Sequence, residues 1–109
     1  MIQFSETNEV VIKREYRAIL VGVAFDEAAI EASMEELSNL AEAAGCEVIG
    51  RMVQSAERRN GATLIGSGKV TELAELCEKM EADTVIFNEE LSGMQLRNLE
   101  EALKVRVVD

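Results

Sequence analysis

A chain of 109 residues fits one domain of ordinary size, and its 48% of hydrophobic residues is enough to build a core, which excludes a disordered chain. The net charge of −10 excludes a protein that coats nucleic acid with its whole surface, although a local basic site stays open. Because histidine is absent, a Cys/His zinc site and any nucleophile activated by histidine are excluded as well.

The first half of the chain predicts an arm, a strand and a helix. Residues 1–16 are irregular, and residues 9–13 are expected to pair as an edge strand or arm. The continuous apolar run at residues 17–23 is typical of a strand buried on both faces. A helix follows between an N-cap at Asp26 and a terminating glycine at Gly45. Apolar residues three or four positions apart form its predicted buried face: Ile30, Met34, Leu37, Leu40, Ala41 and Ala44.

The second half predicts three more strands and two more helices. The strands are expected at residues 48–53, 84–87 and 105–108. A long polar connection follows the first of them, and within it residues 62–65 are expected to form a short extended piece. Apolar residues at helical spacing mark the next helix: Val70, Leu73, Leu76, Cys77 and Met80. Ser92 and Gln95 match a capping box that starts the last helix, which is expected to end near Lys104.

Four short apolar strands that alternate with three helices predict an α/β fold with a small, open, mainly parallel four-stranded sheet. The simplest strand order is 2-1-3-4, counted from the strand at residues 17–23, with helices on both faces. Residues 1–16 are assigned to an N-terminal arm or edge strand and residues 17–109 to the α/β domain. Functional loops leave the carboxyl ends of such strands, yet the chain stops directly after the last strand, so we expect it to be a piece of a longer protein.

The polar connection from Gln54 to Lys69 is the most informative segment. Residues 51–70 hold four basic residues and one acidic residue, a net charge of +3, whereas the rest of the chain carries −13. The glycine-rich turn Gly66-Ser-Gly-Lys69 leads into a helix, and backbone N–H groups at a helix N-terminus beside a lysine suit a phosphate of any origin. The alternative is a turn that only carries the chain into the helix. The predicted RNA-binding or anion-binding residues are Arg58, Arg59, Gly66, Gly68 and Lys69.

The same segment fails the test for the phosphate loop of a nucleoside triphosphatase. That motif requires G-x-x-x-x-G-K-[ST], and here Thr63 and Val70 occupy the positions of the first glycine and the hydroxyl residue. A phosphoryl-accepting receiver domain fits poorly too, because Asn88 stands where the acceptor aspartate would be. The residues therefore predict no catalytic site and no metal site.

The cysteines and the hydropathy of the chain indicate the cellular compartment of the protein. The chain has two cysteines, Cys46 and Cys77, and no secretory signal sequence, so we expect two reduced, partly buried thiols in a cytoplasmic protein. No apolar run approaches the length needed to span a membrane.

Three parts of the chain together resemble the N-terminal domain of the HflX family of ribosome-associated GTPases. They are residues 17–23 with 33–45, residues 53–59 with 63–70, and residues 85–92 with 95–103 and 107–109. The combination of Ile65-Gly-Ser-Gly-Lys-Val70 with Phe87-Asn-Glu-Glu-Leu-Ser92 makes the resemblance specific. The chain departs from the family pattern at Gly61 and Leu64, near the usual loop prolines and tyrosine, and at Gly93, where a proline is usual.

The resemblance implies a longer protein, with a helical hairpin and a GTPase domain beyond this fragment. GTP and Mg²⁺ are then expected in that GTPase domain, whereas this fragment is expected to hold no cofactor and to be no enzyme. The implied partners are the large ribosomal subunit with its ribosomal RNA and the protein's own GTPase domain, in a role on stalled ribosomes under stress. Two alternatives stay open: a separate ATP- or GTP-binding module, and a structural domain that restrains the GTPase domain.

Overall fold

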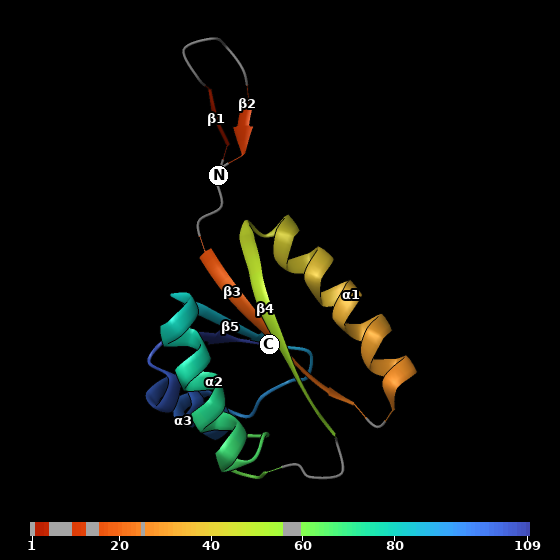
Figure 1. Ribbon diagram of the computed structural model, residues 1–109, viewed down its shortest axis with the longest axis vertical. Helices are drawn as coiled ribbons and strands as arrows, with labels where there is room; N and C mark the ends of the chain where they lie inside the picture. Colours follow the sequence, from red (N-terminus) through yellow and green to blue (C-terminus); the bar gives the residue numbers. More distant parts are fainter. Residues whose placement is uncertain (1, 5–9, 13–15, 25, 56–59) are drawn as a thin grey trace.

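The computed structural model describes residues 2–4, 10–12, 16–24, 26–55 and 60–109 (Figure 1). Its main part alternates strands and helices. The strands are β3 (Tyr16–Ala24), β4 (Cys46–Ser55), β5 (Thr84–Phe87) and β6 (Arg106–Val108), and the helices are α1 (Glu27–Ala43), α2 (Ser67–Met80) and α3 (Gly93–Leu103). The strands are all parallel in the order β4-β3-β5-β6, which confirms the predicted order 2-1-3-4.

A two-stranded hairpin precedes this sheet. Its strands β1 (Ile2–Phe4) and β2 (Val10–Ile12) pair antiparallel with each other. Most of the predicted strand at residues 9–13 is therefore a strand, but it pairs with β1 and not with the four-stranded sheet. The sequence does not predict β1, because three residues are too few to establish an alternating pattern. The division of the chain at residue 17 stays a prediction.

β3 is buried on both faces because helices cover both sides of the sheet, α1 on one side and α2 with α3 on the other (Figure 1). Side chains of a strand alternate between its faces, so Ile19 and Val21 join the core under α2 and α3, whereas Leu20 joins the core under α1. A Cβ on Gly22 would lie only 2.5 Å from the Met34 sulfur, so glycine at this position lets α1 approach the strand closely.

α1 has the predicted ends but a narrower buried face than predicted. The Asp26 carboxylate accepts a hydrogen bond from the backbone N–H of Ala29 at 2.7 Å, and Gly45 has a φ of 92° just after the helix. Ile30, Met34 and Ala41 are buried as expected. The prediction was wrong for Leu40, which is 61% exposed, and for Ala44, which is exposed too. Leu40 lies about 100° around the helix from its buried neighbour Ala41, which is enough to turn it to solvent.

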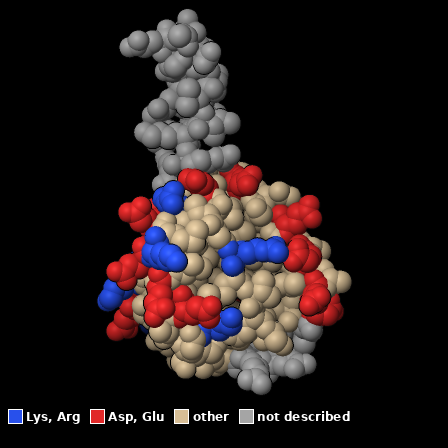
Figure 2. Space-filling view, in the orientation of Figure 1, with Lys and Arg blue, Asp and Glu red and all other residues tan. Residues whose placement is uncertain are grey.

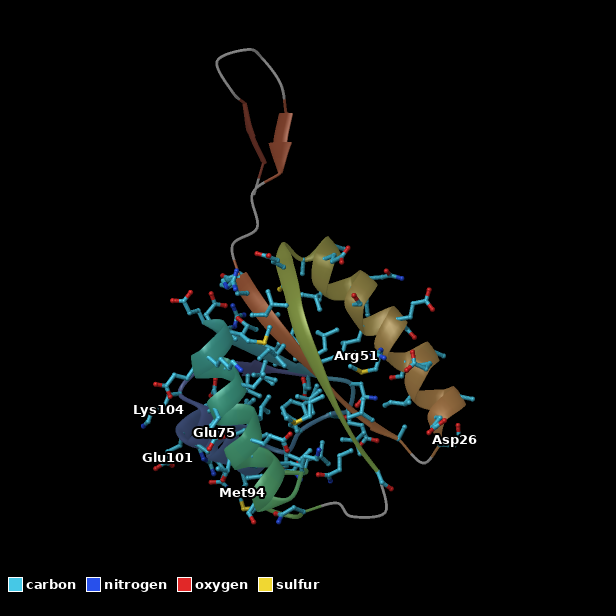
Figure 3. The ribbon with its side chains drawn as sticks, in the orientation of Figure 1. Asp26, Arg51, Glu75, Met94, Glu101 and Lys104 are labelled. Atoms are coloured by element: carbon cyan, nitrogen blue, oxygen red, sulfur yellow. The ribbon has the colours of Figure 1, made fainter. Side chains whose placement is uncertain are left out.

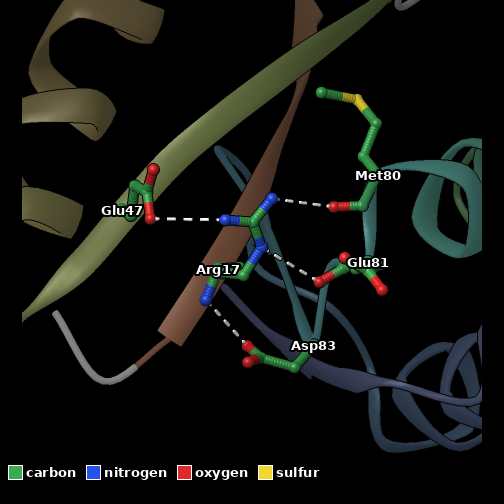
Figure 4. Close-up of polar contacts among 5 residues, drawn as sticks. All are labelled: Arg17, Glu47, Met80, Glu81 and Asp83. Carbon is green, nitrogen blue, oxygen red and sulfur yellow. Dashed lines mark hydrogen bonds and ion pairs between the residues drawn. The ribbon is translucent and has the colours of Figure 1, made fainter.

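Arg17 connects the amino end of the sheet to the carboxyl end of α2 (Figure 4). Its guanidinium donates hydrogen bonds to the carbonyl oxygens of Met80 at 3.0 Å and Glu81 at 3.2 Å, and lies 3.5 Å from the Glu47 carboxylate. Its backbone N–H donates to the Asp83 carboxylate at 3.0 Å. A positive charge at a helix C-terminus is favourable, because the last carbonyls of the helix carry partial negative charge. Arg17 therefore fixes α2 relative to the central strand.

Replacement of Arg17 by methionine tests this connection. The variant loses two charged hydrogen bonds to helix carbonyls and one exposed ion pair, so we expect the free energy of unfolding to fall by about 1–2 kcal/mol. The matched control is Arg51→Met, which removes only the exposed ion pair with Glu31, whose charged atoms are 3.0 Å apart. We expect the control to lower it by less than roughly 0.5 kcal/mol in urea denaturation. Equal changes in the two variants would contradict the role given to Arg17.

Candidate functional site

The predicted site residues that the structure describes lie at the start of α2. Gly66 is the N-cap residue with an extended backbone, at φ −63° and ψ 157°, and Gly68 and Lys69 lie in the first turn of the helix. Arg58 and Arg59 lie outside the described residues. Three of the five predicted residues are thus brought together at one helix N-terminus.

A tight turn leads into this helix start, and the predicted extended piece at residues 62–65 is wrong. The backbone groups of Asn60 and Leu64 hydrogen-bond in both directions, at 2.8 and 2.7 Å, and close the turn between them. Leu64 has a φ of 66°, which no strand residue adopts. Leu64 and Ile65 are buried in the core with α2 and α3, so the apolar residues that indicated a strand instead anchor a turn.

Amide side chains from three elements hold the turn in place. The Asn60 side-chain oxygen accepts hydrogen bonds from the backbone N–H groups of Ala62 at 2.8 Å and Thr63 at 3.3 Å, as asparagine commonly does in turns. From α3, Asn98 donates to the carbonyl oxygen of Ala62 at 3.0 Å. From β4, Gln54 accepts from the backbone N–H of Gly66 at 3.1 Å. The sequence does not predict these amides as part of the site, although the pair Asn60-Gly61 is a recognised turn signal.

The start of α3 supports the same turn. Ser92 and Gln95 form the predicted capping box, with the Gln95 N–H donating to the Ser92 hydroxyl at 3.1 Å and the Ser92 N–H donating to the Gln95 side chain at 2.9 Å. The amide nitrogen of Gln95 also donates to the carbonyl oxygen of Asn60 at 3.4 Å. Gln95 therefore belongs to the capping box of α3 and, like Asn98, links α3 to the turn before α2.

The first turn of α2 presents free backbone donors. No side chain caps the helix, and among the described residues the N–H groups of Ser67, Gly68 and Lys69 have no acceptor. These groups carry the positive end of the helix dipole. The Lys69 ammonium adds a full charge, with its Nζ 3.7 Å from the Glu72 carboxylate. Such an arrangement is suited to the oxygens of a phosphate or carboxylate.

The fold does not require glycine at either position of this helix start. The φ of Gly66 is accessible to any residue, and a Cβ on Gly66 or Gly68 would meet no described atom within 4 Å. Glycine inside a helix costs about 0.5–1 kcal/mol relative to alanine. Gly68 is exposed, whereas Gly66 is half-buried.

Charge around the site is less positive than the sequence predicts. Arg51 contributes to the basic count of residues 51–70, but it lies on the α1 side of β4 and pairs with Glu31 (Figure 3). Because α2 covers the other side of the sheet, Arg51 does not belong to the site. Of the four basic residues counted there, Lys69 lies at the helix start, and Arg58 and Arg59 lie outside the described residues.

Two other motifs have structural roles. Val70, at the hydroxyl position of a phosphate loop, is buried in the core and cannot help to bind a metal–nucleotide complex. The Asn88 side chain accepts from the backbone N–H of Val23 at 2.9 Å and donates to its carbonyl oxygen at 3.2 Å. It also donates to the Ser33 hydroxyl at 2.9 Å. Asn88 thus joins β5, β3 and α1, which explains the residue without a receiver-type site.

Both cysteines are buried, and neither forms a disulfide. Cys46 lies in the core under α1 and Cys77 in the core under α2, on opposite sides of the sheet, so they do not form a disulfide. Burial raises the pKa of the Cys77 thiol above its usual value. Within the described residues, no group of three or more acidic or cysteine side chains could hold a metal ion, and no helix is long and apolar enough to cross a membrane.

Comparison with known proteins supports the family resemblance that the sequence suggests, over most of the chain. A family model described as "GTP-binding GTPase N-terminal" matches residues 31–109. A GTPase HflX from Caldanaerobacter subterraneus subsp. tengcongensis is 44% identical over 93% of this chain and 23% of its own length. The GTPase HflX of Alkalihalophilus pseudofirmus is 43% identical over 84% of this chain and 22% of its own length. The GTPase HflX of Escherichia coli is 31% identical over 85% of this chain and 22% of its own length. The chain spans about a quarter of the length of these relatives.

Solved structures agree with the fold. A crystal structure of a mutation variant of SsGBP superposes with a TM-score of 0.61 at 21% identity, covering 84% of this chain and 28% of that one. The C-terminal catalytic domain of TnpA, a serine recombinase, superposes with a TM-score of 0.60 at 21% identity, covering 84% of this chain and 65% of that one. At this level of identity the similarity concerns the fold alone.

The geometry predicts that the chain does not bind nucleoside triphosphates. Thr63 and Val70 replace the glycine and hydroxyl residue of a phosphate loop, and Val70 is buried, so the triphosphate and its Mg²⁺ lack their usual ligands. Calorimetric titration of the chain with ATP or GTP and Mg²⁺ up to millimolar concentration should give no saturable heat. Saturable binding would contradict this prediction and favour a separate nucleotide-binding module.

Proposed function

The chain belongs to the GTP-binding GTPase N-terminal family, with relatives named GTPase HflX, and we propose that it is the domain by which such a GTPase docks on the large ribosomal subunit. The contact is between ribosomal RNA phosphates and the start of α2. The observation that carries the proposal is the uncapped first turn at residues 67–69, whose backbone N–H groups have no acceptor among the described residues and whose position is held by the turn from Asn60 to Leu64.

The charge distribution supports an RNA contact confined to this end of the molecule. The chain carries −10, so most of its surface repels a polyanion. The solvent side of α1 holds five glutamates, namely Glu27, Glu31, Glu35, Glu36 and Glu42. Repulsion from this helix and attraction to the start of α2 together orient the domain, with α1 directed away from the RNA.

The remaining chemistry belongs to other parts of the full-length protein. GTP and Mg²⁺ are bound by a GTPase domain outside this chain, and the protein acts in the cytoplasm on ribosomes that have stalled under stress. The role of this domain is to dock on the subunit and so to place the GTPase domain there. Restraint of the GTPase domain by direct packing is the competing function, and it predicts no loss of subunit binding when the start of α2 is altered.

Removal of the basic residues should weaken docking. In the full-length protein, the combined change of Arg58, Arg59 and Lys69 to alanine removes the three positive charges of the predicted RNA-binding residues. We expect weaker binding to the large subunit, and a slope of log K against log salt that becomes shallower by roughly 0.7–0.9 for each phosphate that the variant no longer neutralises. Co-sedimentation at several salt concentrations measures both effects.

Arg51→Ala is the control for this experiment, because Arg51 pairs with Glu31 on the far side of the sheet. It should bind the subunit like the unchanged protein. An unchanged affinity and salt slope in the triple variant would refute the proposed docking contact.

A single glycine substitution separates docking from stability. Gly68→Ala places a methyl group in the open space over the first turn of α2, and alanine is the better helix former by up to about 1 kcal/mol. We therefore expect the domain to become more stable while the affinity of the full-length protein for the large subunit falls severalfold. Thermal unfolding and co-sedimentation measure the two changes.

Gly93→Ala, at the start of α3, is the matched control because a Cβ there also meets no described atom within 4 Å. It should stabilise the fold by a similar or smaller amount and leave subunit binding unchanged. Equal binding by the Gly68 and Gly93 variants would argue that RNA does not approach the first turn of α2.

A further inference from the structure

β4 is an edge strand whose outer side has no strand partner among the described residues. It pairs with β3 alone, and from Gly50 to Ser55 the register between the two strands is regular. β6, the other edge of the sheet, has three residues, whereas β4 has ten and contains no proline. Proteins commonly keep edge strands short, because an open edge is a template for pairing with another strand. β4 therefore offers the backbone groups that an added strand needs.

Two pockets lie one after the other between this edge and α1. The larger has a volume of about 560 Å³, and the half-buried side chains of Val48 and Ile49 are part of its lining. The smaller has a volume of about 210 Å³ and lies further along β4 at Val53, which is 41% exposed. Figure 2 shows this edge of the sheet, with acidic side chains on the side where α1 lies. The two pockets together are called the α1–β4 surface below.

Three glutamates of α1 form one wall of the α1–β4 surface. Glu27, Glu31 and Glu35 are four residues apart and so lie on one side of the helix. Glu27 lines the smaller pocket, and the other two line the larger one. Among the described residues, only Glu31 of the three has an ion-pair partner, Arg51 at 3.0 Å. An unpaired carboxylate therefore lies at each end of this surface.

The spacing of these carboxylates matches the spacing of side chains on an extended strand. Four residues of a helix rise by about 6.0 Å. Alternate residues of a strand, which point to the same face, are about 6.6–6.8 Å apart. A strand that runs along β4 with two basic residues four positions apart can therefore place one beside Glu27 and the other beside Glu35. The residue midway between them lies near the pair of Arg51 and Glu31.

The charge of the α1–β4 surface selects a basic polypeptide as the occupant. α1 contains five glutamates and no basic residue, so this surface repels RNA. A second copy of the chain is disfavoured as well. Antiparallel pairing of two β4 edges would bring two α1 helices to the same face of the joined sheet, and each chain carries −10. An extended segment with lysine or arginine side chains meets the opposite charge and pairs with the open backbone.

We propose that the α1–β4 surface binds an extended basic segment of a protein partner. The segment pairs with the outer side of β4 as an added strand, and two basic side chains four positions apart reach Glu27 and Glu35. An apolar side chain between them covers the apolar part of the surface. This surface lies beside α1, whereas the proposed RNA contact is at the start of α2, so the two proposals stand or fall separately.

A synthetic peptide with blocked ends, Thr-Lys-Thr-Val-Thr-Lys-Thr, is the probe, and the same peptide with glutamate in place of lysine is its control. In NMR titrations of the chain of residues 1–109, the lysine peptide should shift the backbone amides from Gly50 to Val53 saturably, and the glutamate peptide should not. When about nine-tenths of the chain is bound, the amides of this stretch that do not bond to β3 should exchange about tenfold more slowly. No saturable shift, or no added protection, would overturn the proposal.

Removal of the two unpaired carboxylates tests the charge argument. Glu27→Gln combined with Glu35→Gln removes two exposed ion pairs with the peptide, so the lysine peptide should bind roughly two- to thirtyfold more weakly. The matched control combines Glu75→Gln with Glu101→Gln, which removes the same charge from exposed positions on α2 and α3 (Figure 3). The control should bind the peptide like the unchanged chain. Equal affinities of the two variants would contradict the proposal.

Arg51→Met provides a test in which binding increases. The variant removes the cation that lies between the two unpaired carboxylates and frees the carboxylate of Glu31. The lysine peptide should therefore bind severalfold more tightly, a gain that damage to the fold would not produce. Unchanged or weaker binding would overturn the charge argument. Shifts of the β4 amides on dilution of the chain without peptide would show that a second copy occupies the edge and would also overturn the proposal.

Discussion

The structure depends on the central strand β3, which pairs with a strand on each side and is covered by helices on both faces. β5 has only four residues, whereas β3 has nine, so β5 alone cannot pair with the whole of β3. Two polar side chains beside β5 bond the backbone of β3 beyond the ends of β5. At one end the Asp83 carboxylate accepts from the backbone N–H of Arg17, and at the other the Asn88 amide bonds both backbone groups of Val23. Both ends of a strand buried on two faces are thereby hydrogen-bonded, as buried backbone groups require.

The position of the candidate site follows from this frame. Arg17 fixes the carboxyl end of α2 to β3, and amides from β4 and α3 fix the turn before its amino end. The backbone donors of its first turn have no partner among the described residues. Gly68, inside the first turn, costs stability and is exposed, and local departures of this kind are expected where a protein makes a functional contact.

The fold could be predicted because β3 and β5 are mostly apolar runs and α1 and α3 carry clear start signals, namely Asp26 and the Ser92 capping box. The turn between Asn60 and Leu64 could not, since its buried Leu64 and Ile65 look like strand residues and only tertiary packing shows that they anchor a turn. Asn88 looks like a polar turn residue in the sequence because its partner Val23 is 65 positions away. Gly66, Gly68 and Lys69 lie at the helix start that the sequence predicts, and their binding role stays a prediction. The amides that hold the turn could not be predicted, because they depend on contacts between distant segments.

Docking through the start of α2 is tested most directly by locating the RNA contact in the full-length protein bound to the large ribosomal subunit. A photo-cross-linking amino acid is placed at Ser67, exposed in the first turn of α2, and in a second variant at Asn39, exposed on α1. The proposal predicts cross-links to ribosomal RNA from position 67 and none from position 39. Cross-links from position 39 alone, or from neither position while the protein stays bound, would contradict it.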